Sequence, residues 1–133
     1  MERFLLVCLG GALGSGARYL VSVWALAALG PAFPYGTLAV NALGSFLICA
    51  LMHLAVTAQL IPAPLALFLT TGVMGGFTTY STFDYETFKY VQGGAHGLAL
   101  LYVAATLVVC FAAGAAGDAL ARAVGGLASA AKP

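Results

Sequence analysis

Charged residues are scarce in this chain of 133 residues: only 7% are Asp, Glu, Lys or Arg, whereas 62% are hydrophobic. A soluble domain carries roughly 25% charged residues because water must solvate its surface. A mean hydropathy of +1.03 argues against a soluble exterior, and five Lys or Arg residues are too few for a nucleic-acid-binding patch. The composition therefore predicts an integral membrane protein whose outer solvent is the bilayer.

Constellations for catalysis and metal binding are also missing. Cys8, Cys49 and Cys110 stand alone within apolar segments, without the paired spacing of a redox or zinc motif. We interpret them as small buried hydrophobic residues. His53 lies near a helix end and His96 lies in a turn, and neither has an evident partner in the sequence. No Ser/His/Asp triad or carboxylate pair stands out, so we do not expect an enzyme.

Four apolar segments are long enough to cross a membrane, for which a helix needs about 20 residues. We expect these crossings at about residues 4–29, 35–58, 65–91 and 97–124. The connections between them are a few residues long, which favours antiparallel neighbours in one compact four-helix transmembrane domain over residues 1–133. The first segment could instead be a signal peptide, but it is too long, it contains Arg18, and three further crossings follow it. The sequence thus predicts an all-α, multi-pass protein of the cell (inner or plasma) membrane.

The positive-inside rule gives little guidance on orientation. Four crossings would put Arg3, Arg122 and Lys132 on one side of the membrane and Lys89 toward the other, and the three short loops contain no Lys or Arg. The charge bias is therefore weak, and insertion in either orientation is possible.

Polar residues recur at four-residue spacing, and so on one helical face, in two of the segments. The stripes are Thr37, Asn41 and Ser45 on the second segment, and Tyr102, Thr106, Cys110, Gly114 and Asp118 on the fourth. Polar groups inside a bilayer are costly, so they face other helices or a water-filled path. Hydroxyl groups can also bond between packed helices, but the amide of Asn41, deep in its crossing, needs several partners and favours a functional role.

The third segment is poor material for a continuous helix, because Gly75 and Gly76 are followed by Thr and Ser residues. We expect a break near mid-membrane, at about residues 75–79. A break persists only where protein, ion or water meets the freed backbone groups. Carbonyls before it could hold a cation, and amides and hydroxyls beyond it could hold an anion. The alternative is that the glycine pair only allows close helix contact.

Two aromatic residues follow the expected break. Tyr80 and Phe83 are three residues apart and lie beside Ser81, Thr82 and Glu86, along a polar stripe. The edge of an aromatic ring carries partial positive charge. Two ring edges could therefore line an anion path without binding the ion as tightly as a full positive charge would.

Three motifs in this order resemble the Fluc (CrcB) family of small fluoride channels, over nearly the whole chain. They are Gly10–Tyr19 (GGALGSGARY), Gly36–Gly44 (GTLAVNALG), and Gly72–Phe83 followed by Glu86. The resemblance implies a fluoride-selective channel that passively exports fluoride and so relieves its toxicity. It also implies an antiparallel, dual-topology homodimer with two fluoride pathways.

The resemblance assigns roles to residues at matching positions. Asn41 would be the pore asparagine that donates to fluoride, and Tyr80 and Phe83 would form the aromatic box. The rest of the fluoride pathway would comprise Thr37, Ser81, Thr82, Glu86, Tyr102 and Thr106. Arg18 would be structural or anion-attracting. Backbone carbonyls of Gly75 and Thr78 would hold a structural Na⁺, shared across the dimer.

Two positions depart from the family pattern: Tyr80 stands where phenylalanine is more usual, and Asp84 where a small polar residue is usual. The hydroxyl of Tyr80 could donate to fluoride or alter its route, and the carboxylate of Asp84 could slow anion passage. The main alternative function is a proton-coupled small-molecule exporter resembling small multidrug-resistance transporters. Those depend on a membrane-embedded carboxylate in the first helix, where this chain offers only Arg18. A non-transporting assembly subunit would explain the small-residue faces but not the break, the hydroxyls and the aromatic pair together.

Overall fold

The structure, a computed structural model, describes residues 1–130 and the side chains of residues 1–127. Its regular structure within that range is helical, which confirms the all-α class. The three long helices are α1 (Glu2–Leu29), α2 (Tyr35–Met52) and α6 (His96–Ala130). Five shorter elements lie between α2 and α6: the π-helical η1 (His53–Thr57), α3 (Ala63–Leu67), the π-helical η2 (Phe68–Met74), α4 (Gly75–Phe77) and α5 (Tyr80–Gln92). Lys132, one of the charges considered for orientation, lies outside the described residues.

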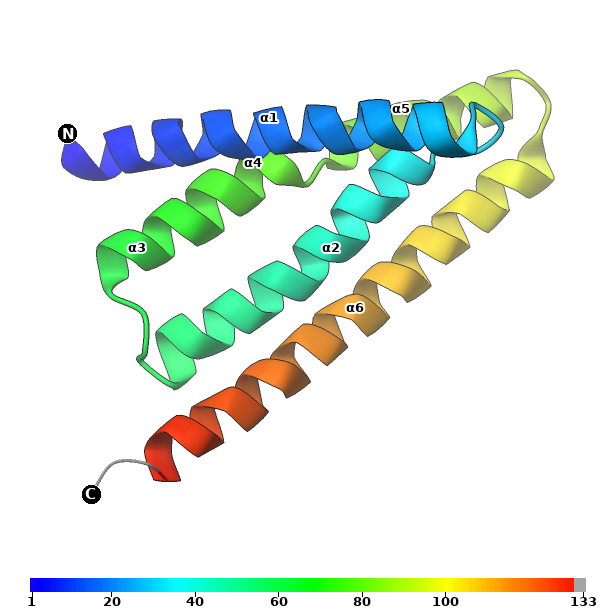
Figure 1. Ribbon diagram of the computed structural model, residues 1–133. Coiled ribbons are helices and arrows are strands. Elements are labelled where there is room, and N and C mark those ends of the chain that lie inside the picture. The colour runs from blue at the N-terminus through cyan, green and yellow to red at the C-terminus, as the bar shows by residue number, and fades with distance from the viewer. Residues whose placement is uncertain (131–133) are drawn as a thin grey trace.

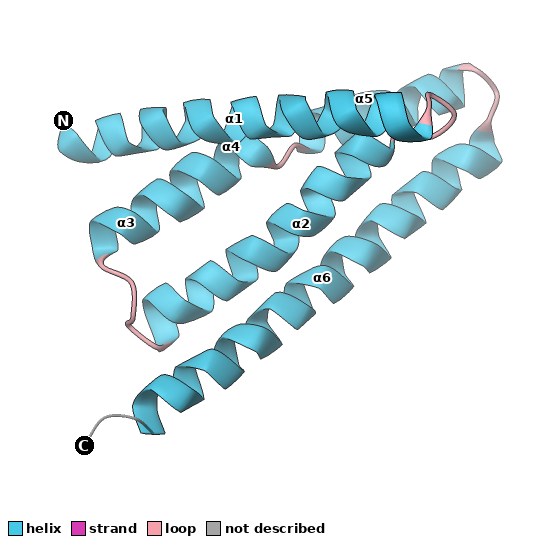
Figure 2. Ribbon diagram, viewed as in Figure 1, coloured by secondary structure: helices cyan, strands magenta, loops and turns pink. Residues whose placement is uncertain are grey.

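The elements form an up-and-down arrangement. Figure 1 shows α1 and the series from α3 to α5 running in one direction, and α2 and α6 running in the other. Helices α2 and α6 lie side by side over most of their length, and α1 packs against η2 and α4. The connecting loops are short (Figure 2), so consecutive segments run antiparallel, as the sequence predicts.

Within residues 1–130, three helical stretches are long and apolar enough to cross a membrane: Glu2–Leu29, Tyr35–Thr57 and His96–Leu127. The remaining crossing that the sequence predicts, residues 65–91, corresponds to α3, η2, α4 and α5. None of these elements alone has the length of a crossing. That residues 65–91 cross the membrane as one segment therefore stays a prediction.

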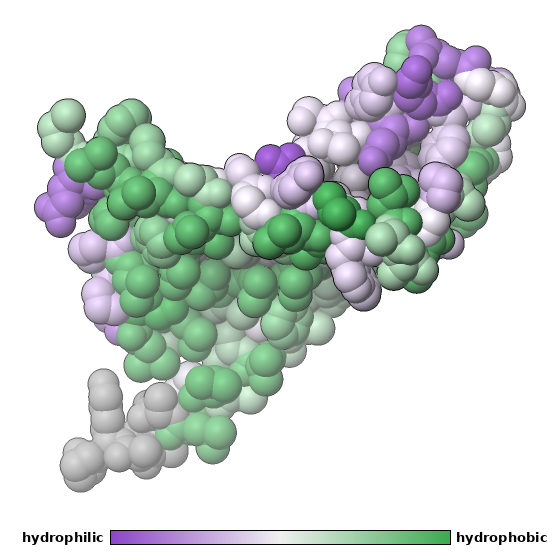
Figure 3. Space-filling model, turned by 45° about the horizontal axis from the view of Figure 1, so that its top comes forward, coloured by the Kyte–Doolittle hydropathy of each residue, from purple (hydrophilic) through white to green (hydrophobic). Residues whose placement is uncertain are grey.

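The surface is mostly apolar, as a lipid-facing surface must be. Figure 3 shows hydrophobic residues over the middle of the molecule and hydrophilic ones gathered mainly at its two ends. Large side chains on α1 and α6 are widely exposed, among them Leu13 at 63%, Val108 at 68% and Phe111 at 83%. The interior, by contrast, is small and contains Val40, Met74 and Phe77, where α2 meets η2 and α4.

Glycines let α1 pack directly on the backbone of η2 and α4. A Cβ added at Gly14 would collide with the carbonyl oxygen of Val73, and one added at Gly76 would collide with that of Gly11. Small residues of this kind bring membrane helices into close contact. Gly75 and Gly76 are themselves helical in α4, so the glycine pair does not form the interruption, and Gly76 serves the close contact that we considered as the alternative.

The helical turns stop after Phe77 and resume at Tyr80 (Figure 2). Thr78 (φ −77°, ψ 156°) and Thr79 (φ −150°, ψ 119°) are extended. The amide and the hydroxyl of Thr78 both donate to the carbonyl of Met74, at 3.0 and 2.9 Å, and complete the last turn of α4. The side chain of Thr79 is the N-cap of α5, because its oxygen accepts from the amide of Thr82 at 3.3 Å.

Candidate functional site

The side chain of Asn41 on α2 is paired with the backbone of Thr79. Its Nδ2 donates to the carbonyl of Thr79 at 2.9 Å, and its Oδ1 accepts from the amide of Thr79 at 2.8 Å. In a continuous helix the Thr79 amide would instead donate to the carbonyl of Gly75, four residues earlier. Asn41 therefore replaces the backbone partners that the interruption removes.

The carbonyl of Gly76 is satisfied in a similar way from α1. Arg18 Nε donates to it at 3.0 Å, and the hydroxyl of Ser15 lies 3.5 Å away. A cation near the carbonyl end of a helix is electrostatically favourable. Of the two roles considered for Arg18, this contact favours the structural one.

Glu86 on α5 accepts two hydrogen bonds from buried hydroxyls. Thr37 Oγ1 donates to its Oε1 at 2.9 Å, and the hydroxyl of Tyr102 donates to its Oε2 at 2.7 Å. Thr37 is 5% exposed and Tyr102 is fully buried. Hydrogen bonds to a carboxylate are stronger than those between neutral groups, so Glu86 ties α5 to both α2 and α6.

Aromatic rings surround this network. The ring centroids of Phe83 and Tyr102 lie 5.1 Å apart in an edge-on arrangement, and Phe33 and Tyr90 also contact Tyr102 edge-on. Tyr80 lies 5.8 Å from Phe83 and is 76% exposed. The predicted aromatic pair is therefore in contact, with Phe83 buried and Tyr80 at the surface of this single chain.

A cavity of about 330 Å³ lies between α2, the interruption, α5 and α6. Its lining includes four residues expected in the pathway, Asn41, Tyr80, Phe83 and Thr106, and also Cys110. Thr106 is 8% exposed, and its hydroxyl has no hydrogen-bond partner among the described residues. A buried donor without a partner is costly, so this hydroxyl has a hydrogen-bonding need that the described residues do not meet.

Two further cavities lie on the α1 side of Thr79. One, of about 280 Å³, is lined by Arg18 and six hydroxyl-bearing residues: Ser15, Tyr19, Ser22, Thr37, Thr79 and Thr82. The other, of about 260 Å³, shares Thr37 and Thr82 with it and includes Glu86.

Ser81 and Gly75 lie outside these three cavities, whereas Thr78 lines the one that holds Asn41. Ser81 lies on the exposed side of α5, and its hydroxyl is 3.5 Å from that of Thr79. Gly75 is exposed, and a Cβ added there would meet no atom within 4 Å. Thr78 uses its hydroxyl on the carbonyl of Met74. The described single chain therefore does not enclose Ser81 or Gly75 in these cavities, and Tyr102 reaches them only through its hydrogen bond to Glu86.

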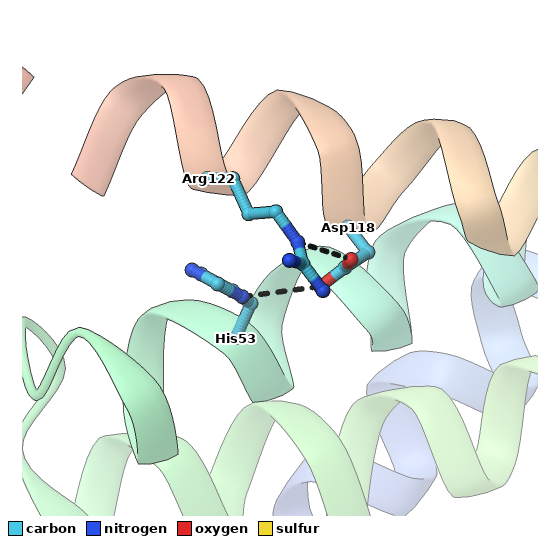
Figure 4. A network of polar contacts seen from close by, with 3 residues as sticks. All are labelled: His53, Asp118 and Arg122. Carbon is cyan, nitrogen blue, oxygen red and sulfur yellow. Dashed lines mark hydrogen bonds and ion pairs between the residues drawn. The ribbon is translucent and has the colours of Figure 1, made fainter. Parts of the chain in front are cut away.

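A charged network joins the far ends of α2 and α6. Asp118 accepts from Arg122 Nε at 2.7 Å through its Oδ2, and its Oδ1 lies 3.1 Å from His53 Nδ1 (Figure 4). We expected no partner for His53, and this expectation was wrong. The only signal in the sequence is the four-residue spacing of Asp118 and Arg122, which pairs opposite charges on a helix.

The cysteines are partly as expected. Cys49 and Cys110 are half-buried, but Cys8 is exposed on α1, so its interpretation as a buried residue was wrong for this chain alone. In the described part of the chain the three thiols are free, and no three His, Cys, Asp or Glu side chains come together to hold a metal ion.

These features define a small helical membrane protein with an interrupted helix. Side chains from neighbouring helices satisfy the backbone groups at the interruption, next to a polar, aromatic-lined cavity. Residues 5–118 match the family model described as CrcB-like protein, Camphor Resistance (CrcB). The chain belongs to this family, which confirms the resemblance drawn from the three motifs.

Relatives support the same conclusion. The chain is 56% identical over 122 residues to the fluoride-specific ion channel FluC of Anaeromyxobacter dehalogenans, covering 92% of this chain and 97% of that one. It is 49% identical over 122 residues to the FluC of Sorangium cellulosum, covering 92% and 96%. It is 51% identical over 107 residues to a FluC of Thermus thermophilus, covering 80% and 84%. The family is one of multi-pass membrane ion channels and not of enzymes.

Proposed function

We propose that this chain is a fluoride-selective channel through which accumulated fluoride leaves the cell passively, down its gradient. Fluoride is small and strongly hydrated, so a selective pore must replace its water with hydrogen-bond donors. A narrow path without a strong fixed cation favours fluoride over larger halides and still lets it leave. The printed names of the relatives support this function.

One feature supports it above the others: Thr106, whose buried hydroxyl has no partner among the described residues, lines the same cavity as Asn41 and Phe83. Asn41 donates one amide proton to the carbonyl of Thr79. An amide nitrogen carries two protons, so the second is available to an ion. The ring edges of Phe83 and Tyr80 complete the set of weak donors. Thr37, Ser81, Thr82, Glu86 and Tyr102 would then form the polar track that continues from this cavity.

A structural Na⁺ would be held by the backbone carbonyls of Gly75 and Thr78. The residues present fit such an ion, because the amide of Thr79 donates to Asn41 and leaves the Gly75 carbonyl without its helical donor. Unwound backbone carbonyls are suitable Na⁺ ligands in membrane proteins. When bound, the ion would fix the interrupted segment in place.

A second copy, inserted antiparallel, would share that ion and close the pathway. Gly75 is exposed and has open space beside it, so a partner can reach it. The polar exposed side of α5, which includes Ser81 and Asp84, would be costly against lipid tails and is better covered by protein. Residues 65–91 would then be one crossing, interrupted at Thr78 and Thr79 near the middle of the bilayer.

Fluoride efflux from liposomes containing the purified protein tests this function. Fast fluoride efflux without chloride efflux is expected, and the Asn41→Asp variant should lose it because a carboxylate neither donates to Thr79 nor tolerates an anion beside it. Folded wild-type protein that moves no fluoride would refute the proposal. The exporter alternative has no similar support, because its required first-helix carboxylate is replaced by Arg18, which is bonded to Gly76.

A further inference from the structure

The later residues of the two polar stripes lie on facing sides of a groove between α2 and α6, with Ser45 on α2 and Thr106, Cys110, Gly114 and Asp118 on α6. Beyond the cavity that holds Asn41, a second cavity of about 520 Å³ continues between these helices. The two cavities share Ser45, Ile48, Thr106, Leu107 and Cys110, so they adjoin. The close approach of the helices has a visible cause, because a Cβ added at Gly114 would lie 3.1 Å from the sulfur of Cys49.

The groove extends as far as Asp118, the last residue of the α6 stripe. Thr106, whose buried hydroxyl has no partner among the described residues, lines both cavities. An anion bound at the Thr106 hydroxyl would therefore lie in a cavity that adjoins the one lined by Asp118.

A bare carboxylate at this position would oppose the proposed function. A fluoride ion that moved along the groove toward Asp118 would be repelled by the carboxylate, and more strongly beside a low-dielectric wall than in water. The side chain of Asp118 is 34% exposed, so solvent alone does not screen it fully. Something must offset its charge if fluoride is to pass along the groove.

Arg122 is positioned to do this from outside the groove. Its Nε lies 2.7 Å from Asp118 Oδ2, while its side chain is 70% exposed. His53 contacts the other oxygen at 3.1 Å from the end of α2. Figure 4 shows both side chains directed at the carboxylate, one to each oxygen. The positive charge thus meets the carboxylate without lining the path, where a free cation would hold fluoride too tightly.

We propose that Arg122 is a positioning residue for fluoride conduction: it cancels the charge of Asp118 at the end of the α2–α6 groove and so keeps that end open to anions. This inference rests on the proposed function. It assigns an electrostatic role to a network that the three family motifs do not contain.

Fluoride efflux from liposomes at low and high ionic strength tests the inference, with the Arg122→Gln variant and the Asp118→Asn/Arg122→Gln double variant. At low ionic strength the single variant should conduct about three- to tenfold more slowly than wild type, because the carboxylate is left uncompensated. Added impermeant salt should reduce that deficit, since it screens exposed charges, and the double variant should restore the rate. The matched control is Lys89→Gln, which removes a positive charge on α5 away from the groove, next to Tyr85.

The outcomes separate the inference from the proposed function. An Arg122→Gln rate equal to wild type, or a deficit that neither salt nor Asp118→Asn changes, would overturn the inference while wild-type conduction still supports the channel. A purely structural role for Arg122 would give such a salt-independent deficit, with a shifted melting temperature in detergent. Wild-type protein that conducts no fluoride would overturn both.

Discussion

Asn41 and Thr79 exchange two hydrogen bonds across the point where the helical turns are interrupted, at 2.9 Å and 2.8 Å. An extended residue inside a bilayer protein exposes an amide and a carbonyl that lipid cannot satisfy. A side-chain amide is uncharged and offers a donor and an acceptor side by side in a single plane. This pairing explains why an asparagine serves here, and it places the remaining amide proton beside the cavity.

Replacing Asn41 with alanine should destabilise the fold as well as stop fluoride efflux. Both backbone groups of Thr79 lose their partner, and a buried polar group left unpaired costs about 1–3 kcal/mol. Thermal unfolding in detergent, followed by circular dichroism, measures the loss. Thr70→Ala is the control, because the Thr70 hydroxyl bonds only to the Ala66 carbonyl of its own segment. Equal melting temperatures for the two variants would contradict the pairing.

The two adjacent glycines should respond differently to alanine. Gly76→Ala places a methyl group against the Gly11 carbonyl oxygen and forces α1 and α4 apart, for which overpacking costs of about 1–3 kcal/mol are typical. Gly75→Ala meets nothing within 4 Å in one chain. It should leave the melting temperature of the monomer unchanged and weaken only assembly with a second copy.

Unfolding in detergent together with cross-linking in liposomes separates these effects. A Gly75→Ala variant that cross-links and conducts like wild type would count against a close antiparallel contact at this position.

Tyr102→Phe should impair the channel more than Tyr90→Phe does. The Tyr102 hydroxyl is fully buried and donates to Glu86 at 2.7 Å, and a hydrogen bond to a charged group contributes about 1.5–3 kcal/mol. The Tyr90 hydroxyl makes only a long, exposed contact of 3.4 Å with the Ala32 carbonyl. Melting temperatures and fluoride efflux rates of the two variants, compared side by side, provide the check. Equal melting temperatures and efflux rates for the two variants would mean that the hydrogen bond from Tyr102 to Glu86 contributes to neither stability nor conduction.

Tyr80→Phe should keep fluoride-selective efflux, whereas Tyr80→Ala should lose most of it. The ring edge, which we expect to contact the ion, survives only in the first variant. The Tyr80 side chain is 76% exposed in the single chain, so both variants should fold normally. Tyr85→Phe, another exposed tyrosine of α5 at 61%, is the control. Undiminished efflux in Tyr80→Ala would remove Tyr80 from the pathway.

The sequence predicted which residues belong to the candidate pathway better than it predicted their contacts. Asn41, Phe83 and Thr106 were expected in one pathway from spacing and resemblance, and they line one cavity. The interruption was expected at about residues 75–79 because glycine is a poor helix former, and the helical turns stop within that range, at Thr78 and Thr79. The glycines themselves stay helical in α4, where Gly76 packs against Gly11, while Thr79 caps α5 and Asn41 satisfies its backbone.

His53 shows the same limit. Its partner Asp118 is 65 residues away along the chain, and neither spacing nor composition connects a residue of η1, just after α2, with one on α6. That contact exists only because the two helices pack side by side.

The sequence by itself determined that this protein lies in a lipid bilayer, that it is helical, and which family it belongs to. These depend on composition and on local patterns: too few charges for a water-exposed surface, apolar runs of crossing length, and three ordered motifs. The tertiary structure decided which polar groups satisfy one another, because hydrogen bonds between separate helices depend on their distance and rotation. It therefore paired Asn41 with Thr79, Arg18 with Gly76 and Arg122 with Asp118. It left the buried hydroxyl of Thr106 without a hydrogen-bond partner among the described residues.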